Sequence, residues 1–180
     1  MALRTGNRYK EGQAKIKHNV YINGKKVENL EDNPNTKTVL DATAKLFDLA
    51  KESQYDGIMN ATSSLSPKKV SRWLHPSCSP KDLEMRAEMA LLCSQKLGTC
   101  AYRCLGCDTI HATASTTYEV ERKLGTEYHK RFIDWLNYVQ ENDLAVSGGV
   151  MDAKGPRDIR PGEGDPDHYV RVAEKHSDGI

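Results

Sequence analysis

The stretch SPKDLEMRAEMALLCSQKLGTCAYRCLGCDTIHATASTTYEVERKLG, residues 79–125, decides the fold. Ser79 can cap a helix, Pro80 suits the first helical position, and Asp82 suits the positive end of the helix dipole. Apolar side chains then recur with helical period at Leu83, Met89, Leu92, Cys93, Leu97, Cys100 and Cys104. The stretch therefore predicts a long helix as the main element of a mainly helical protein.

The predicted helix ends near Leu124, because Gly125 is a typical residue after a last helical turn. Gly98 and Gly106 are the positions at which it can break into two pieces. Shorter helices are predicted over residues 7–17, from a cap at Asn35 or Thr36 to Ala50, and from a cap at Thr126 through the apolar stripe Phe132, Trp135, Leu136 and Val139. Residues 1–143 are therefore expected to form a helical domain.

Asn23-Gly24 predicts a tight hairpin between Val20–Ile22 and Lys26–Val27, because both turn residues tolerate a positive φ. Residues 60–79 are expected to form a loop with a short helical turn.

The residue composition changes after residue 143. Residues 144–146 and 168–175 have the composition of strands, and Asp178-Gly179 is a hairpin turn with no return strand. We expect residues 144–180 to be the start of an incomplete β-domain. The chain is then either a fragment or one of two chains that together make the protein.

Composition narrows the function classes. Among 180 residues, 26 Lys and Arg balance 25 Asp and Glu, and the two signs are interspersed, which argues against nucleic-acid binding. No apolar run approaches the ~20 residues of a membrane span, and the N-terminus lacks the apolar core of a secretion signal. An odd number of cysteines, five, favours a reducing, cytoplasmic setting over a disulfide framework.

Cys100 and Cys104 are four residues apart, which on a helix would place both thiols on one face with Cβ atoms roughly 5–6 Å apart. Two such thiols are half of a metal site, and sulfur favours zinc, copper(I) or an iron–sulfur cluster. The alternative is packing, since free cysteine is among the most buried residue types; we expect Cys78 and Cys93 to be of that kind.

With Cys107 the run also matches the Cys-x3-Cys-x2-Cys signature of radical S-adenosylmethionine enzymes. That match is treated as accidental, because the flanks have a helical pattern and no series of βα units follows.

Several motifs along the chain carry a family resemblance. They are Arg4-Thr5-Gly6, Val20-Tyr21-Ile22-Asn23-Gly24, Cys100-x-x-Arg103-Cys104-x-Gly106, Ser115-Thr116-Thr117-Tyr118-Glu119, Gly125-Thr126-x-Tyr128-His129-Lys130, Gln140-Glu141-Asn142-Asp143-Leu144 and Asp152-x-Lys154-Gly155-x-Arg157. Together they resemble the first part of the 4-hydroxyphenylacetate 3-hydroxylase family of flavoproteins. Within it, the cysteine pair resembles the branch that dehydrates 4-hydroxybutyryl-CoA to crotonyl-CoA and isomerises vinylacetyl-CoA.

The resemblance implies two cofactors. Cys100 and Cys104 correspond to two ligands of a [4Fe–4S] cluster whose other two ligands lie later in the family's enzymes, and Cys107 is not a ligand. FAD is implied to contact Val150, Met151, Asp152, Lys154, Gly155 and Arg157. Lys154 and Arg157 would meet the pyrophosphate, although Ala153 replaces the family's usual Pro.

The implied protein is a homotetramer of acyl-CoA dehydrogenase-like architecture that acts on an acyl-CoA. This segment would need the remainder of the enzyme, from a C-terminal part or a second chain, and would be inactive alone. Two alternatives stay open. One is a flavin-dependent aromatic hydroxylase of the same family, without iron. The other is a non-catalytic helical module whose cysteines pack or bind zinc.

Overall fold

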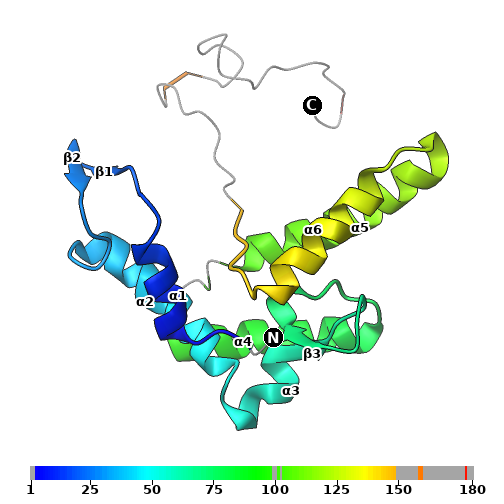
Figure 1. Cartoon of the computed structure of the whole chain (residues 1–180), viewed down its shortest axis with the longest axis horizontal. Coiled ribbons are helices and arrows are strands. Elements are labelled where there is room, and N and C mark those ends of the chain that lie inside the picture. The colour runs from blue at the N-terminus through cyan, green and yellow to red at the C-terminus, as the bar shows by residue number, and fades with distance from the viewer. Residues whose placement is uncertain (1–2, 99–100, 102, 149–157, 160–176, 178–180) are drawn as a thin grey trace. The chain divides into compact units, whose positions relative to one another are not determined.

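The computed structural model describes residues 3–98, 101, 103–148, 158–159 and 177. The chain divides into two compact units, Met1–Gly148 and Gly149–Ile180, and the elements described here belong to the first. Helices dominate that unit, which confirms the predicted mainly helical class (Figure 1). The α-helices are α1 (Gly6–Ala14), α2 (Pro34–Leu49), α3 (Asp56–Met59), α4 (Pro80–Leu97), α5 (Cys104–Leu124) and α6 (Tyr128–Glu141).

The long predicted helix is two helices, and the break is at Gly98. Ser79 caps α4 by accepting a hydrogen bond from the Asp82 N–H, and Gly98 ends it with a left-handed φ of 63°. Gly125 ends α5 in the same way, with a φ of 64°. A positive φ is unstrained only for glycine, so both helix ends follow from the sequence. The prediction that the helix continues through residues 98–103 is wrong, because α4 ends at Leu97, Ala101 and Arg103 lie outside any helix, and α5 begins at Cys104; Cys100 itself lies outside the described residues.

Two helix starts differ from prediction. α2 begins at Pro34 with Asn33 as its cap, two or three residues before the expected cap at Asn35 or Thr36. α6 is preceded by Glu127 rather than capped by Thr126. Its first-turn N–H groups, those of His129 and Lys130, donate instead to the Glu121 carboxylate of α5 at 3.1 and 3.3 Å. The cap of α6 is therefore supplied by its neighbouring helix.

Two small antiparallel ribbons join the helices. The predicted hairpin is confirmed: β1 (Val20–Ile22) pairs with β2 (Lys25–Val27) around Asn23 and Gly24, whose φ values are 50° and 75°. A second ribbon, β3 (Asn60–Thr62) with β4 (Lys69–Ser71), lies where a loop was predicted. Its strands are three residues long and lack an alternating apolar pattern, so periodicity could not reveal them. The short helical turn expected there is η2 (Arg72–Leu74), and a second one, η1 (Ser53–Tyr55), precedes α3.

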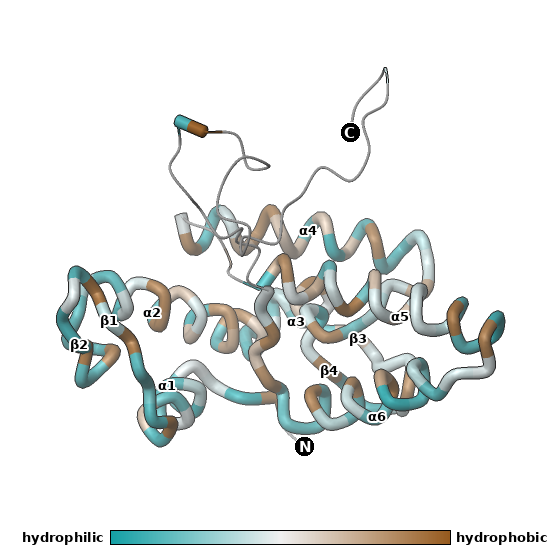
Figure 2. Tube along the Cα trace, turned by 90° about the horizontal axis from the view of Figure 1, so that it is seen from above, coloured by the Kyte–Doolittle hydropathy of each residue, from teal (hydrophilic) through white to brown (hydrophobic). Residues whose placement is uncertain are grey.

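The core consists of three apolar clusters along the helices, and Figure 2 shows apolar positions interspersed with polar ones along α2 and α4. The central cluster joins α2, α3, α4 and α5 through Leu46, Leu49, Ala50, Met59, Trp73, Met89, Cys93 and Cys107. The second joins α5 and α6 through Leu74, Ile110, Phe132, Leu136 and Val139. The third joins α1 and α2 through Tyr9, Leu40, Ala44 and Phe47. Cys93 is buried as expected, whereas Cys78 is exposed and not part of the core.

The strand predicted over Leu144–Val146 is absent, since residues 144–148 have irregular backbone. Leu144 and Val146 pack against the second cluster, and the Leu144 N–H donates to the Val139 carbonyl at 3.0 Å. Packing on helices therefore uses the same apolar residues that a sheet would have used. The other elements of the predicted β-domain, residues 168–175 and Asp178-Gly179, lie outside the described residues. Among the helices that the structure describes, none combines the length and apolar character that crossing a membrane requires.

Candidate functional site

Cys104 is the first residue of α5, and its side chain is exposed. The N–H groups of a first helical turn have no intrahelical acceptor, and the helix dipole is positive there, so the position suits a negatively charged group. Cys107 lies one turn further on and is 1% exposed. Burial raises the pKa of the Cys107 thiol, which keeps it neutral and suits it to packing. The two neighbouring cysteines thus have opposite environments.

Arg103 directly precedes Cys104 and is 2% exposed, which makes it the largest of the fully buried side chains described. Its guanidinium lies over the Phe47 ring at 4.8 Å and over the Trp73 ring at 6.0 Å. One Nη donates to the Leu144 carbonyl at 3.2 Å. Burial lowers the pKa of Arg103 to about 10, and the nearby Asp143 carboxylate opposes that shift. Arg103 is therefore still a cation at neutral pH.

The N-terminal segment also contributes to this site, through Arg4. The Arg4 N–H donates to the Asp143 carboxylate at 2.8 Å, and the Arg4 guanidinium lies 5.5 Å from the Phe47 ring. Asp143 is buried and has a φ of 44°, a left-handed conformation that aspartate tolerates better than most residues. Burial raises the pKa of Asp143, against the influence of both arginines. We call Arg4, Phe47, Arg103 and Asp143 the arginine cluster.

The segment that follows α6 runs against the start of α5. A Cβ built on Gly106 would lie 2.2 Å from the Val146 carbonyl oxygen, and one on Gly148 would lie 2.7 Å from Leu105 Cγ. Both glycines therefore permit a contact that any side chain would block. As a result, residues 146–148 lie against the turn that carries Cys104.

The other predicted site residues lie outside the described part of the chain. They are Cys100, Val150, Met151, Asp152, Lys154, Gly155 and Arg157. In the described part, no group of three His, Cys, Asp or Glu side chains could hold a metal ion. The structure therefore places Cys104 alone among the predicted cofactor-binding residues, and the pairing of Cys100 with Cys104 stays a prediction.

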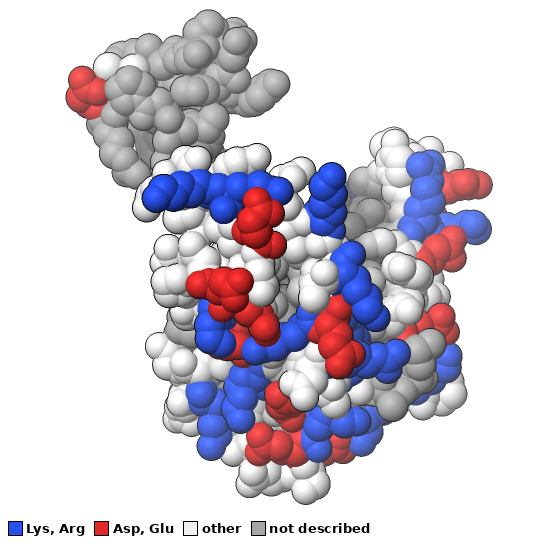
Figure 3. Space-filling model, turned by 60° about the vertical axis from the view of Figure 1, so that its left-hand side comes forward, with Lys and Arg blue, Asp and Glu red and all other residues white. Residues whose placement is uncertain are grey.

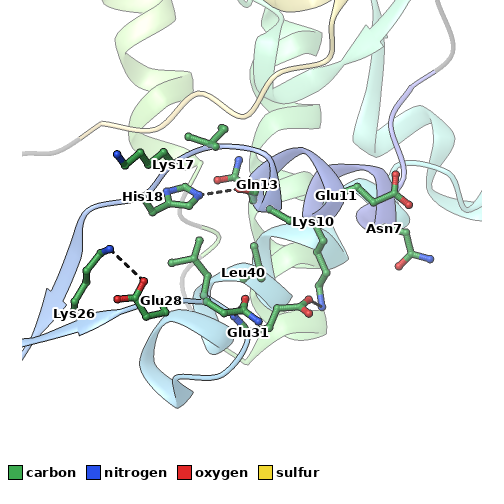
Figure 4. Close-up of a pocket in the computed structure, with 14 residues that line it drawn as sticks. Asn7, Lys10, Glu11, Gln13, Lys17, His18, Lys26, Glu28, Glu31 and Leu40 are labelled. Atoms are coloured by element: carbon green, nitrogen blue, oxygen red, sulfur yellow. Dashed lines mark hydrogen bonds and ion pairs between the residues drawn. The ribbon is translucent and has the colours of Figure 1, made fainter.

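A hollow with a volume of about 640 Å³ lies between α1, the β1–β2 hairpin and the start of α2 (Figure 4). Some of its charged side chains form ion pairs, Lys10 with Glu31 at 3.5 Å and Lys26 with Glu28 at 3.2 Å. Cys104, the predicted site residue that the structure describes, is not among its lining residues. We assign this hollow no function.

Charge on the visible face agrees with the balanced composition. In Figure 3, Lys and Arg side chains alternate with Asp and Glu over this face, and no patch of one sign stands out. The described residues also form exposed ion pairs, such as Lys68 with Glu141 at 2.9 Å and Lys69 with Asp56 at 2.6 Å. This face therefore offers no basic stripe of the kind that follows a phosphate backbone.

The sequence did not reveal the importance of Arg103 and Asp143. Both belong to motifs that carry the family resemblance, Cys100-x-x-Arg103-Cys104-x-Gly106 and Gln140-Glu141-Asn142-Asp143-Leu144. A signal was present, since an arginine next to a buried helical turn is unusual. The partners of Arg103, however, come from segments 30 to 56 residues away in the chain.

Comparison with known proteins gives one family and two kinds of relative. Residues 5–180 match the family model described as 4-hydroxyphenylacetate 3-hydroxylase N terminal. Over 179 residues the chain is 40% identical to the 4-hydroxybutyryl-CoA dehydratase/vinylacetyl-CoA-Delta-isomerase of Clostridium aminobutyricum, and the match covers 99% of this chain and 36% of that protein. The chain thus spans about a third of the length of this relative.

Solved structures agree. An oxygen-tolerant archaeal 4-hydroxybutyryl-CoA dehydratase from N. maritimus superposes with a TM-score of 0.83 and 34% identity, covering 98% of this chain and 35% of that one. The HpaB oxygenase component of 4-hydroxyphenylacetate 3-monooxygenase, complexed with FAD and 4-hydroxyphenylacetate, gives 0.68 and 21%, covering 98% and 36%, which shows a shared fold. The chain therefore belongs to the 4-hydroxyphenylacetate 3-hydroxylase N-terminal family.

Proposed function

We propose that this chain is the N-terminal part of an FAD- and [4Fe–4S]-dependent dehydratase that converts 4-hydroxybutyryl-CoA to crotonyl-CoA and isomerises vinylacetyl-CoA. The observation that carries the proposal is the 40% identity to a dehydratase/isomerase over 99% of the chain. Identity to the oxygenases of the same fold is only 20–21%. An acyl-CoA substrate, a homotetramer, the remainder of the enzyme as partner and a cytoplasmic setting belong to the same proposal.

The environment of Cys104 fits a cluster ligand. An exposed thiol at a helix N-terminus, directly after a buried guanidinium, is suited to carry the negative charge of a metal-bound thiolate. Cys107, buried and neutral, fits packing. We propose Cys100 and Cys104 as the two ligands from this chain. When bound, the cluster would supply a Lewis-acidic iron for the departing hydroxyl, and FAD would accept and return an electron.

The proposed FAD-contacting residues are Val150, Met151, Asp152, Lys154, Gly155 and Arg157. Lys154 and Arg157 would hold the pyrophosphate through charge-assisted hydrogen bonds, and Gly155 would let the backbone approach it. The contact of Val146 and Gly148 with the first turn of α5 supports this assignment, because Gly148, two residues before Val150 in the sequence, packs against Leu105.

A second candidate function is flavin-dependent hydroxylation of an aromatic compound. It is favoured by the fold shared with HpaB, at a TM-score of 0.68. That function needs no thiol at position 104. The two candidates therefore make opposite predictions about iron.

Anaerobic purification of the full-length enzyme, followed by absorbance and iron analysis, tests the proposal. We expect broad brown absorbance together with bound flavin. Cys104→Ala should lose the iron and the conversion of 4-hydroxybutyryl-CoA. Cys107→Ala is the matched control and should keep both, since its thiol is buried and neutral. Flavin without iron in the unmodified enzyme would instead support the hydroxylase, and full iron in Cys104→Ala would remove Cys104 from the ligand set.

A further inference from the structure

A contribution to the stability of the fold does not explain well why the Arg103 cation is buried. Among the described residues, its side chain donates to the Leu144 carbonyl, and its Nε has no hydrogen-bond partner. The carboxylate that most influences it, Asp143, accepts its hydrogen bond from Arg4 instead. Burying a charge without a direct ion pair is costly, and an apolar side chain of similar volume usually stabilises such a site better.

The position of Arg103 suggests what it provides. It is covalently next to Cys104, and its carbonyl accepts the first helical hydrogen bond of α5, from the Cys107 N–H at 3.0 Å. Its guanidinium is held between the Phe47 and Trp73 rings and bonds to the backbone at Leu144. One side chain thus joins the start of α5 to the start of the segment that leads toward residue 150.

We propose that Arg103 is a positioning residue for Cys104: it fixes the first turn of α5 against residues 144–148 and keeps a buried positive charge next to this proposed cluster ligand. This inference rests on the proposed function. A nearby positive charge favours the more negative, reduced form of a thiolate-ligated cluster, so it raises the reduction potential. Asp143 should act in the opposite direction, because its carboxylate offsets part of the Arg103 charge.

The test compares variants of the full-length enzyme, purified anaerobically. Arg103→Met removes the charge and roughly keeps the volume, and Arg103→Lys keeps the charge. Arg72→Met is the matched control: Arg72 is also buried, at 7% exposure, but it bonds to carbonyls of Gly57, Ile58 and Asn60. The measurements are iron per flavin, the potential of the cluster, its electron paramagnetic resonance spectrum after reduction, and thermal stability.

We expect Arg103→Met to lower iron content several-fold and to move the potential of the remaining cluster to more negative values. Arg103→Lys should restore the potential, while Arg72→Met should lose thermal stability with iron and potential unchanged. Asp143→Asn gives an independent test if Arg103→Met does not fold, since it keeps an acceptor for Arg4. Its potential should move to more positive values.

The outcomes separate the two hypotheses. An unmodified enzyme without iron would overturn the proposed function and this inference with it. An iron-loaded enzyme in which Arg103→Met behaves like Arg72→Met, or in which Asp143→Asn leaves the potential unchanged, would overturn this inference alone.

Discussion

Gly106 illustrates how much one residue can decide in this molecule. It lies inside α5, and a Cβ at this position would overlap the Val146 carbonyl oxygen at 2.2 Å. The opposing atom belongs to the backbone, which cannot move aside as a flexible side chain can. The absent side chain is therefore what lets residues 144–148 lie across the start of α5.

Gly106→Ala should destabilise the chain, even though alanine is the better helix former. We expect a loss of about 1–3 kcal/mol in the free energy of unfolding, as for other overpacked sites. Gly57→Ala is the control, because a Cβ at Gly57 in α3 meets nothing within 4 Å. Urea unfolding of both variants checks this, and a Gly106→Ala chain as stable as the control would show that residues 144–148 are not held against α5.

Also at the residue scale, the sequence analysis singled out Cys104 as a candidate ligand but not Arg103, the residue before it. Periodicity treats a charged residue in a helical pattern as solvent-facing, so it could not predict the burial of Arg103. That burial depends on Phe47 and Trp73, which long-range packing brings to the same place. Cys104 was found because two thiols at short spacing have a chemical meaning of their own.

Among the elements, the sequence predicted types better than boundaries. Two glycines marked possible breaks in residues 79–125, and only the structure separates their roles: Gly98 supplies a left-handed φ, and Gly106 a close approach. The incorrect prediction of a strand over residues 144–146 has a related cause. A short apolar run can pack on helices or join a sheet, and its sequence does not distinguish the two.

The start of α4 yields a pH-dependent prediction. Burial would raise the pKa of Asp82, but hydrogen bonds from the Ser79 hydroxyl and the Cys78 N–H, with the charges of His75 and Arg72, lower it overall. A lowered folded-state pKa gives stability that is present above the unfolded value of 3.8 and is lost as the pH falls through the folded value.

Asp82→Asn should therefore reduce the free energy of unfolding by about 1–2 kcal/mol at neutral pH. The difference from the unmodified chain should shrink as the pH falls below 3.8. Glu84→Gln, which removes a surface ion pair with Lys81 on the same helix, is the control and should have little effect at any pH. Denaturation curves at several pH values check this, and a difference that is constant with pH would remove the ionic role of Asp82.

At the scale of the whole molecule, the described helices form a core that should fold in the 180-residue chain by itself. The proposed active site, in contrast, should need more of the polypeptide, since the chain spans 36% of its dehydratase relative. We expect the isolated chain to give a helical circular dichroism spectrum, to retain neither iron nor flavin, and to form no crotonyl-CoA. Turnover of 4-hydroxybutyryl-CoA by this chain would show that the site is complete within it.

The hairpin of α5 and α6 has a buried base and an exposed tip. Arg103 and Leu144, 41 residues apart, are joined by a hydrogen bond at its base, whereas Leu124 at its tip is 73% exposed and a Cβ on Gly125 would meet nothing within 4 Å. The 21 residues of α5 separate the two ends by roughly 30 Å. The tip is therefore a natural attachment point for a fluorophore or an affinity tag, because a longer turn there leaves the geometry around Cys104 in place.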